Sequence, residues 1–110
     1  MSIVMNLYYT GEGGAARRFA EEMERSGTAD LIRAEEGNQR YAYFYPADDP
    51  ETVLLIDIWR DQRAIDLHHA SPMMDTIARL REKYGLHMRA ERYVTDPAGI
   101  PEADAEFIRK

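Results

Sequence analysis

The segment from Val53 to Trp59 limits the fold more than any other part of the chain. Apart from Asp57 it is an unbroken run of aliphatic and aromatic residues, which predicts a strand that is buried on both faces of a sheet. Residues 3–10 predict a second strand whose two faces are both largely apolar. A sheet that contains these two strands needs a cover on each side.

Six main elements are predicted along the chain, with one further short helical turn within residues 28–36. Asp61 is a predicted helix N-cap, and Ser71-Pro72 predicts that the helix restarts there, with the serine as cap. The predicted strands are residues 3–10, 40–45, 52–59 and 86–95, and the predicted helices are residues 16–25 and, with the break, 61–84. The order strand, helix, strand, strand, helix, strand predicts an α+β fold, the ferredoxin-like βαββαβ arrangement with an antiparallel sheet and both helices on one face.

Two helices cover only one face of such a sheet. The simplest cover for the other face is the same face of a second copy, because most soluble oligomers are closed homo-oligomers and the dimer is the commonest. We therefore expect a homodimer through sheet-to-sheet packing. The predicted domain spans residues 1–96, and residues 97–110 form a C-terminal tail with a short helix.

The charge and the absence of cysteine disfavour several classes of function. The net charge is −6, whereas nucleic acids and anionic membranes bind basic surfaces, so we expect no nucleic acid and no membrane as partner. A chain without cysteine has neither disulfides nor thiolate chemistry. The N-terminus lacks a leader-like pattern and the longest aliphatic run is too short to cross a bilayer, which predicts a cytoplasmic protein.

Asp57, Trp59 and His68 are the first candidates for a functional site, because the helix after the third strand can bring His68 back over that strand. Asp57 and Trp59 share one strand face by alternation. A buried acid needs a partner, either His68, whose tautomer it would set, or an arginine or backbone amide in a structural role. His68 itself is either a structural residue or a catalytic base. His69 points about 100° away from His68, so no metal site is expected.

The strands supply further candidate residues. Asn6 is the one strongly polar side chain of the first strand, and its amide could hold a ligand oxygen. Trp59 is either a core residue or a wall for a flat aromatic ligand. Tyr43, Tyr8 and Met74 are the other residues expected to contact a substrate, unless tyrosines and methionines fill the pocket instead.

Several short motifs, taken in their order, resemble one protein family. They are Ala34-Glu-Glu-Gly-Asn-Gln-Arg40, Asp57-Ile-Trp59, Ala64, His68 and Ser71-Pro72. Over about residues 1–96 the chain resembles the antibiotic biosynthesis monooxygenase (ABM) family, most closely its small quinol-monooxygenase-like branch. The resemblance implies a dimeric α+β barrel, in agreement with the dimer expected from packing. Haem degradation, known among related members, is not expected, because His68 stands where those enzymes have a catalytic tryptophan.

The resemblance also implies a reaction. Related members include oxygenases that act without a cofactor on quinols and polycyclic phenols, so we expect a cofactor-independent monooxygenase for a small quinol or phenolic substrate. His68, with an ordinary pKa of about 6.5, would be the base, and Asp57 would stabilise the imidazolium. Asn6 would donate a hydrogen bond to the developing oxyanion.

Two alternatives stay open. One is an isomerase of a small hydroxy-carbonyl compound, phosphorylated or not, because the Glu35-Glu36-Gly37-Asn38 and His68 pattern also resembles an isomerase of a signalling sugar. A phosphate would need a cationic anchor, for which Arg33, Arg40 and Arg79 are the candidates. The other alternative is a non-catalytic dimer that binds a small hydrophobic molecule.

Overall fold

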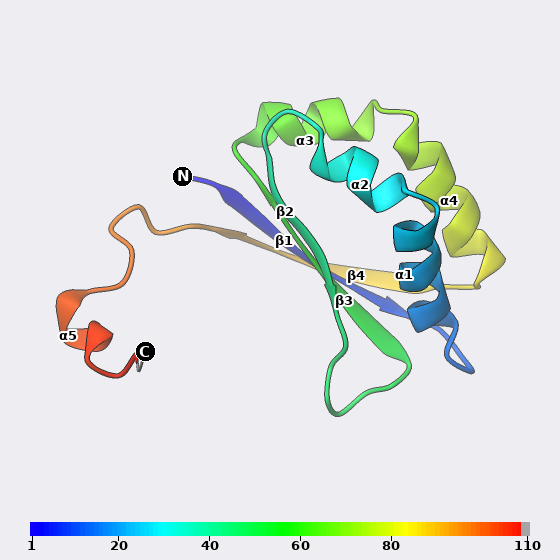
Figure 1. Cartoon of the computed structure of the whole chain (residues 1–110), viewed down its shortest axis with the longest axis horizontal. Coiled ribbons are helices and arrows are strands. Elements are labelled where there is room, and N and C mark those ends of the chain that lie inside the picture. Colours follow the sequence, from blue (N-terminus) through cyan, green and yellow to red (C-terminus); the bar gives the residue numbers. More distant parts are fainter. Residues whose placement is uncertain (109–110) are drawn as a thin grey trace.

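The computed structural model describes residues 1–108 as an antiparallel sheet with helices on one side (Figure 1). Its elements are β1 (Ile3–Thr10), α1 (Ala15–Arg25), α2 (Thr28–Arg33), β2 (Asn38–Phe44), β3 (Thr52–Trp59), α3 (Gln62–His69), α4 (Met73–Lys83), β4 (His87–Val94) and α5 (Glu102–Ala105). The four strands lie in the order β2-β3-β1-β4, and every neighbouring pair is antiparallel. This confirms the predicted ferredoxin-like α+β fold.

The two central strands, β1 and β3, determine which side chains face the helices. Their register pairs Met5 with Asp57 and Leu7 with Leu55. Because side chains alternate along a strand, these residues and Trp59 all lie on the face that the helices cover. Trp59 and Leu55 are among the largest fully buried side chains of the protein, so the core lies between this face and the helices.

The helices follow the predicted pattern closely, with two differences. Phe19 of α1 is fully buried, and Asp61 caps α3 by accepting a hydrogen bond from the backbone N–H of Ala64 at 2.9 Å, as predicted. The first difference is α2, which is a six-residue helix where the sequence indicated a single turn. The second is that Ser71 does not cap α4, because Pro72 occupies the cap position and makes no side-chain hydrogen bond there.

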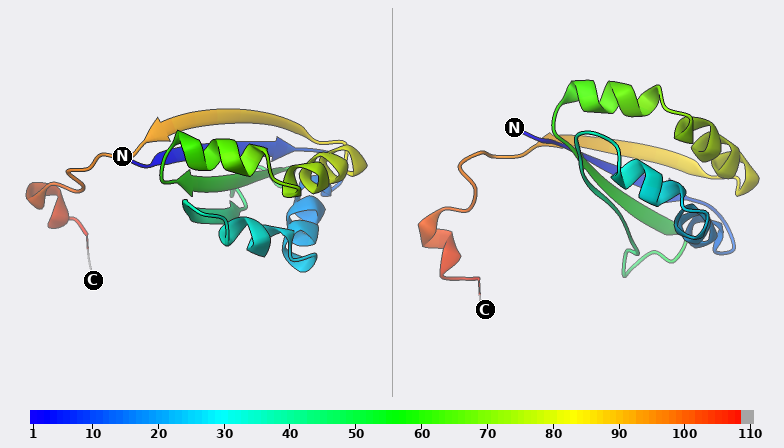
Figure 2. Two further views of the ribbon diagram at one scale, coloured as in Figure 1. Left: turned by 90° about the horizontal axis from the view of Figure 1, so that it is seen from above. Right: turned by 45° about the horizontal axis from the view of Figure 1, so that its top comes forward.

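The opposite face of the sheet carries none of the helices of residues 1–108 (Figure 2). Val4, Ile56 and Ile58 are only half-buried there, and Phe44 and Tyr93 are 40% and 52% exposed. A single copy therefore leaves an apolar surface open, and the sheet-to-sheet homodimer stays a prediction.

The chain leaves the sheet after β4, and α5 stands apart from the rest of the molecule (Figure 1). Ile100 and Phe107 of this segment are exposed. The last two residues of the predicted tail, 109–110, lie outside the described residues. No helix within residues 1–108 combines the length and the apolar character needed to cross a bilayer.

Candidate functional site

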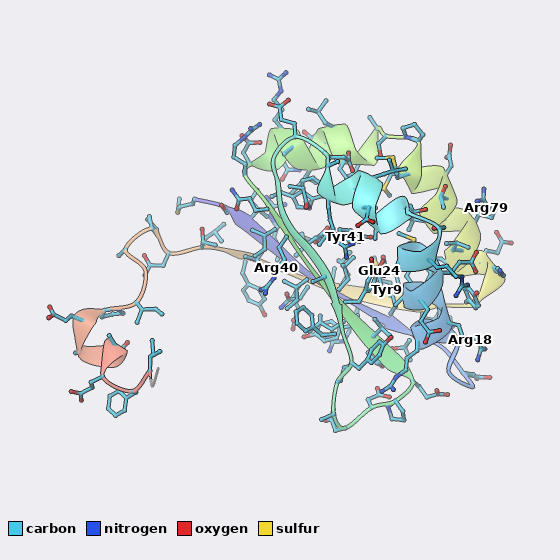
Figure 3. All side chains as sticks on the ribbon, in the orientation of Figure 1. Tyr9, Arg18, Glu24, Arg40, Tyr41 and Arg79 are labelled. Atoms are coloured by element: carbon cyan, nitrogen blue, oxygen red, sulfur yellow. The ribbon has the colours of Figure 1, made fainter. Side chains whose placement is uncertain are left out.

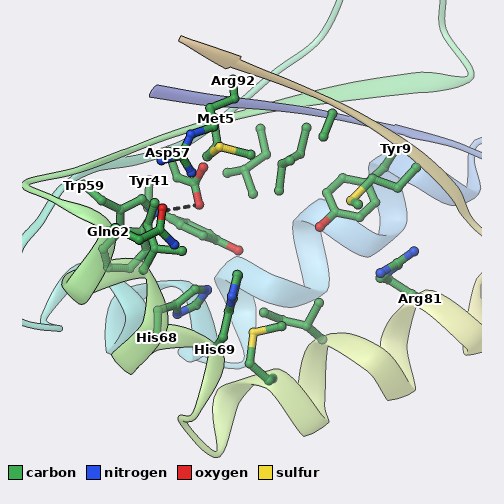
Figure 4. A pocket seen from close by; sticks show the side chains of 17 residues that line it. Met5, Tyr9, Tyr41, Asp57, Trp59, Gln62, His68, His69, Arg81 and Arg92 are labelled. Atoms are coloured by element: carbon green, nitrogen blue, oxygen red, sulfur yellow. Dashed lines mark hydrogen bonds between the residues drawn. The ribbon is translucent and has the colours of Figure 1, made fainter. Parts of the chain in front are cut away.

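A cavity of about 290 Å³ lies between the helix-facing side of the sheet and helices α3 and α4 (Figure 4). Its lining is mostly apolar, with a small number of polar and charged side chains, which is typical of a site for a small organic molecule. The lining residues are Met5, Leu7, Tyr9, Tyr41, Leu55, Asp57, Trp59, Gln62, Ile65, His68, His69, Met74, Ile77, Arg81, Met88, Ala90 and Arg92.

The strand registers arrange the sheet side of this cavity in three rows. Each row consists of residues that pair across neighbouring strands and point to the same face. The rows are Asp57 with Met5 and Arg92, then Leu55 with Leu7 and Ala90, and then Tyr9 with Met88. The middle row is entirely apolar, so the polar groups of the sheet lie at the two ends of the cavity.

Asp57 is the buried acid of the site, with 4% of its surface exposed. Its Oδ2 accepts a hydrogen bond of 3.0 Å from the indole Nε1 of Trp59, which also lies on β3. Its Oδ1 is buried and has no hydrogen-bond partner among residues 1–108. Burial raises the pKa of Asp57 to about 6, although the bonds from Trp59 and from the backbone act in the opposite direction. Asp57 therefore lines the cavity as an acid whose ionised form is disfavoured by burial.

His68 of α3 stacks on the same indole. The imidazole and indole rings are stacked, with 4.7 Å between their centroids and 28° between their planes. Nδ1 of His68 lies 2.7 Å from Oε1 of Glu35. Burial lowers the pKa of His68, and the Glu35 carboxylate opposes that effect only in part. The neutral imidazole thus donates Nδ1–H to Glu35 and keeps Nε2 as a proton acceptor.

Glu35 reaches His68 because the turn between α2 and β2 lies directly against α3. Gly37 in this turn has a φ of +83°, and a Cβ at this position would lie 2.5 Å from the Cβ of Ala64. The Gly37 carbonyl also accepts a backbone hydrogen bond of 2.8 Å from Arg60, at the end of β3. Only glycine fits both the left-handed backbone and this close approach.

Tyr9 and Arg81 form the opposite end of the cavity from Asp57 and His68 (Figure 4). Burial raises the pKa of Tyr9 to about 12, so its hydroxyl is a neutral hydrogen-bond donor. The guanidinium carbon of Arg81 lies 5.8 Å from the centre of the Tyr9 ring. Nε of Arg81 is buried and makes no hydrogen bond within residues 1–108.

The structure brings Asp57, Trp59, His68 and Met74 together around one cavity. The hydrogen bonds differ from those expected, however. Asp57 bonds to the Trp59 indole and not to His68, to an arginine or to a backbone amide of another residue, and the partner of His68 is Glu35. The expectation that Asp57 sets the tautomer of His68 is therefore corrected, and Glu35 takes that place.

Asn6, Tyr8 and Tyr43 do not line this cavity. Asn6 and Tyr8 alternate with Met5 and Leu7 along β1, so their side chains point to the helix-free face of the sheet. Asn6 therefore cannot donate to an oxyanion that forms beside His68. Tyr43 does face the helices, but it packs edge-on against Tyr41 and shares a hydroxyl hydrogen bond of 3.2 Å with it.

The sequence analysis did not predict three residues of the site, which are Tyr9, Glu35 and Arg81. The predicted phosphate anchors Arg33, Arg40 and Arg79 are not among the cavity-lining residues. Arg33 instead forms ion pairs with Glu24 and Asp30. No cluster of three or more His, Cys, Asp or Glu side chains suited to a metal ion occurs within the described part of the chain.

Comparisons with known proteins place this site in a family context. The sequence model of the family described as antibiotic biosynthesis monooxygenase matches residues 1–80. No protein with a curated description matches the chain.

Several solved structures have the same fold at low sequence identity. SnoaB, a cofactor-independent oxygenase from Streptomyces nogalater, is 17% identical, with a TM-score of 0.72 over 86% of this chain and 93% of SnoaB. A Deinococcus radiodurans protein, described as an antibiotic biosynthesis monooxygenase, is 15% identical. Its TM-score is 0.74 over 86% of this chain and 92% of the Deinococcus radiodurans protein. A Pseudomonas aeruginosa protein is 22% identical, with a TM-score of 0.70 over 86% and 93%.

Proposed function

The chain belongs to the antibiotic biosynthesis monooxygenase family, and from this premise we propose that it oxygenates a small quinol or phenol without a cofactor. The observation that carries the proposal is the placement of two proton acceptors around the Trp59 indole in a largely apolar cavity, with Asp57 at the indole N–H and His68 stacked on the ring. The shared fold with a protein described as a cofactor-independent oxygenase supports a reaction of this kind.

The chemistry needs a base and a dry cavity. Dioxygen reacts slowly with closed-shell organic molecules, so the protein must make its substrate electron-rich, and removal of a phenolic proton does this. The phenolate passes one electron to dioxygen, and recombination of the two radicals joins oxygen to a ring carbon that carries a hydrogen. The peroxide anion that forms takes back the proton that the base removed and becomes a hydroperoxide. Loss of water then breaks the O–O bond and leaves a carbonyl group. One oxygen atom enters the product and the other leaves as water.

His68 is the proposed base in this reaction. With Nδ1–H donated to Glu35, Nε2 is free to accept the phenolic proton, and the Glu35 carboxylate stabilises the imidazolium that forms. Asp57 is proposed to hold the Trp59 indole in place through its 3.0 Å hydrogen bond, and so to fix the flat wall against which the substrate ring lies. Asn6 has no part in this scheme, because it lies on the other face of the sheet.

We also infer that two copies of the chain pack their helix-free sheet faces together. The apolar side chains of Val4, Ile56 and Ile58 support this, since their burial is worth about 25 cal/mol for each Å² removed from water. Asn6 and Tyr8 would then lie in the interface between the copies, where the Asn6 amide would find partners.

Oxygen consumption tests the proposed function. Chelator-treated protein is mixed with reduced naphthoquinols and anthrols in an oxygen electrode, and autoxidation without protein is subtracted. We expect protein-dependent uptake, and we expect His68→Gln to slow it by about a hundredfold or more, as for the loss of a general base. His87→Gln, an exposed histidine outside the cavity, is the matched control. Uptake that survives His68→Gln would remove His68 from the chemistry, and no uptake above autoxidation would refute the oxygenase.

A further inference from the structure

Half of the methionines of the chain line one cavity. The sequence contains six methionines, and three of them, Met5, Met74 and Met88, are cavity-lining residues. Methionine often fills irregular apolar space, so packing alone would explain a single one. A thioether sulfur is also readily oxidised, however, and the oxidation product is a sulfoxide. The cavity proposed to carry out an oxygenation is therefore lined by oxidisable sulfur.

Two of the three methionines belong to the part of the cavity that holds the proposed chemistry. Met5 pairs with Asp57 across β1 and β3, and the two side chains lie side by side (Figure 4). Met74 lies in the first turn of α4, directly after the helix that carries His68, and Figure 3 shows sulfur atoms, in yellow, beside the start of α4. Both methionines are half-buried. Met88 differs from them, because it is 39% exposed and belongs to the row at the opposite end of the cavity.

The proposed reaction supplies an oxidant inside this cavity. Its intermediate is a hydroperoxide on a ring carbon, and a thioether sulfur attacks the outer oxygen of a hydroperoxide. The O–O bond breaks, an S–O bond forms, and the proton of the outer oxygen moves to the oxygen that stays on the ring. The sulfur is oxidised by two electrons to a sulfoxide, and the hydroperoxide is reduced by two electrons to a ring alcohol. This transfer needs no further reactant and competes with the loss of water.

Confinement makes the transfer selective. A solute at 1 M has about 1,660 Å³ for each molecule, so one hydroperoxide in a cavity of about 290 Å³ is at about 6 M. Hydroperoxide that escapes is diluted far below this concentration. Met73, the neighbour of Met74, is also half-buried but does not line the cavity. Met1 is 79% exposed, which makes it the methionine that an oxidant in solution reaches most easily.

We propose that Met5 and Met74 are oxidised to sulfoxides by the hydroperoxide that forms in the cavity during turnover. This inference rests on the proposed function and adds a modification site to it. A sulfoxide is polar, so it disrupts the apolar lining against which the substrate ring lies. Activity therefore falls with the number of turnovers completed, and a methionine sulfoxide reductase restores it.

Site-resolved mass spectrometry after turnover tests the inference. The protein consumes oxygen with a reduced naphthoquinol in the presence of catalase and superoxide dismutase, which remove the peroxide and superoxide that autoxidation releases into solution. Fragment ions then give the sulfoxide fraction at each methionine. We expect Met5 and Met74 to carry about fivefold more sulfoxide than Met73, in fractions that rise with the oxygen consumed. Hydrogen peroxide without substrate is the control, and it should oxidise the exposed Met1 and Met88 first.

Leucine variants connect the oxidation with the loss of activity. Leucine is close to methionine in volume and has no sulfur to accept oxygen. The double variant Met5→Leu/Met74→Leu should lose activity at least about threefold more slowly for each turnover. Met73→Leu, the neighbouring exchange outside the cavity, should lose activity at the wild-type rate. Cumene hydroperoxide, added without substrate under nitrogen, supplies an aromatic hydroperoxide directly and should reproduce the preference for Met74 over Met73.

Three results would overturn the inference and leave the oxygenase in place. They are sulfoxide fractions during turnover that put Met1 ahead of Met5 and Met74, equal fractions at Met73 and Met74, and oxygen uptake without sulfoxide at either lining methionine. In a protein that consumes no oxygen, selective oxidation of Met5 and Met74 by cumene hydroperoxide would refute only the oxygenase. Mass spectrometry of the unaltered protein decides the matter even if a variant fails to fold.

Discussion

Replacing Asp57 with asparagine should increase the stability of the protein relative to wild type as the pH rises from 4 to 7. The pKa of Asp57 is about 6 in the folded protein and 3.8 in the unfolded chain, because burial in the folded protein penalises the carboxylate. The folded state therefore binds the proton more tightly than the unfolded state. The stability that this proton contributes is fully present below pH 3.8 and is lost as the pH rises through 6. Asparagine does not ionise and has no such loss.

The magnitude follows from the same two pKa values. One pKa unit corresponds to about 1.36 kcal/mol, so the full difference is about 3 kcal/mol, of which about 2 kcal/mol falls between pH 4 and pH 7. A constant offset is expected in addition, because the amide places a donor where Oδ1 was, but that offset does not vary with pH. The pH-dependent part of the difference is therefore the quantity to measure.

Urea unfolding followed by circular dichroism gives this quantity at pH 4, 5, 6 and 7, at one protein concentration because a dimer would unfold in a concentration-dependent way. Asp48→Asn, the same exchange at an exposed aspartate, is the control. A difference between Asp57→Asn and wild type that stays within about 0.5 kcal/mol over this range would refute the reasoning. So would a change in the opposite direction.

Three further predictions concern the surroundings of the site. Glu35→Gln should lower the pKa of His68 further, because the carboxylate that opposes burial is lost; an imidazole titration by NMR that shows an unchanged or higher pKa would contradict this. Gly37→Ala should destabilise the protein by about 1–2 kcal/mol through the left-handed backbone and the contact with Ala64, and equal urea midpoints would argue against it. Ile56→Lys, on the helix-free face, should convert the predicted dimer to monomers in sedimentation velocity, whereas an unchanged mass would speak against that interface.

The sequence predicted the fold well because its patterns are local. The apolar run from Val53 to Trp59, the capping aspartate Asp61 and the glycine and proline breaks each act within a few residues, and together they leave little choice of element order. The site was harder, because both faces of β1 are apolar and the alternation does not tell which face the helices cover. Asn6 was therefore grouped with Asp57, although the register places the two side chains on opposite faces.

Glu35 and Arg81 were not predicted as site residues for two different physical reasons. Glu35 and His68 are 33 positions apart, and only the packing of Gly37 against Ala64 brings them together, which no local pattern reveals. Arg81 left a signal in the sequence: it stands at helical spacing within an apolar stripe, directly after Leu80. A charge on the buried side of a helix is unusual enough to be examined as a ligand contact.

The middle row on the sheet side of the cavity, formed by Leu55, Leu7 and Ala90, is a place where evolution or engineering can change the size of the cavity. Strands are joined through their backbones, so these side chains can change in size without disturbing the register that holds the two polar ends. Ala90 is the smallest of the three and lies on the edge strand β4, where a larger side chain meets the fewest neighbours. Exchange at this one position should change the length of ligand that fits the cavity, while the side chains at its two ends stay the same.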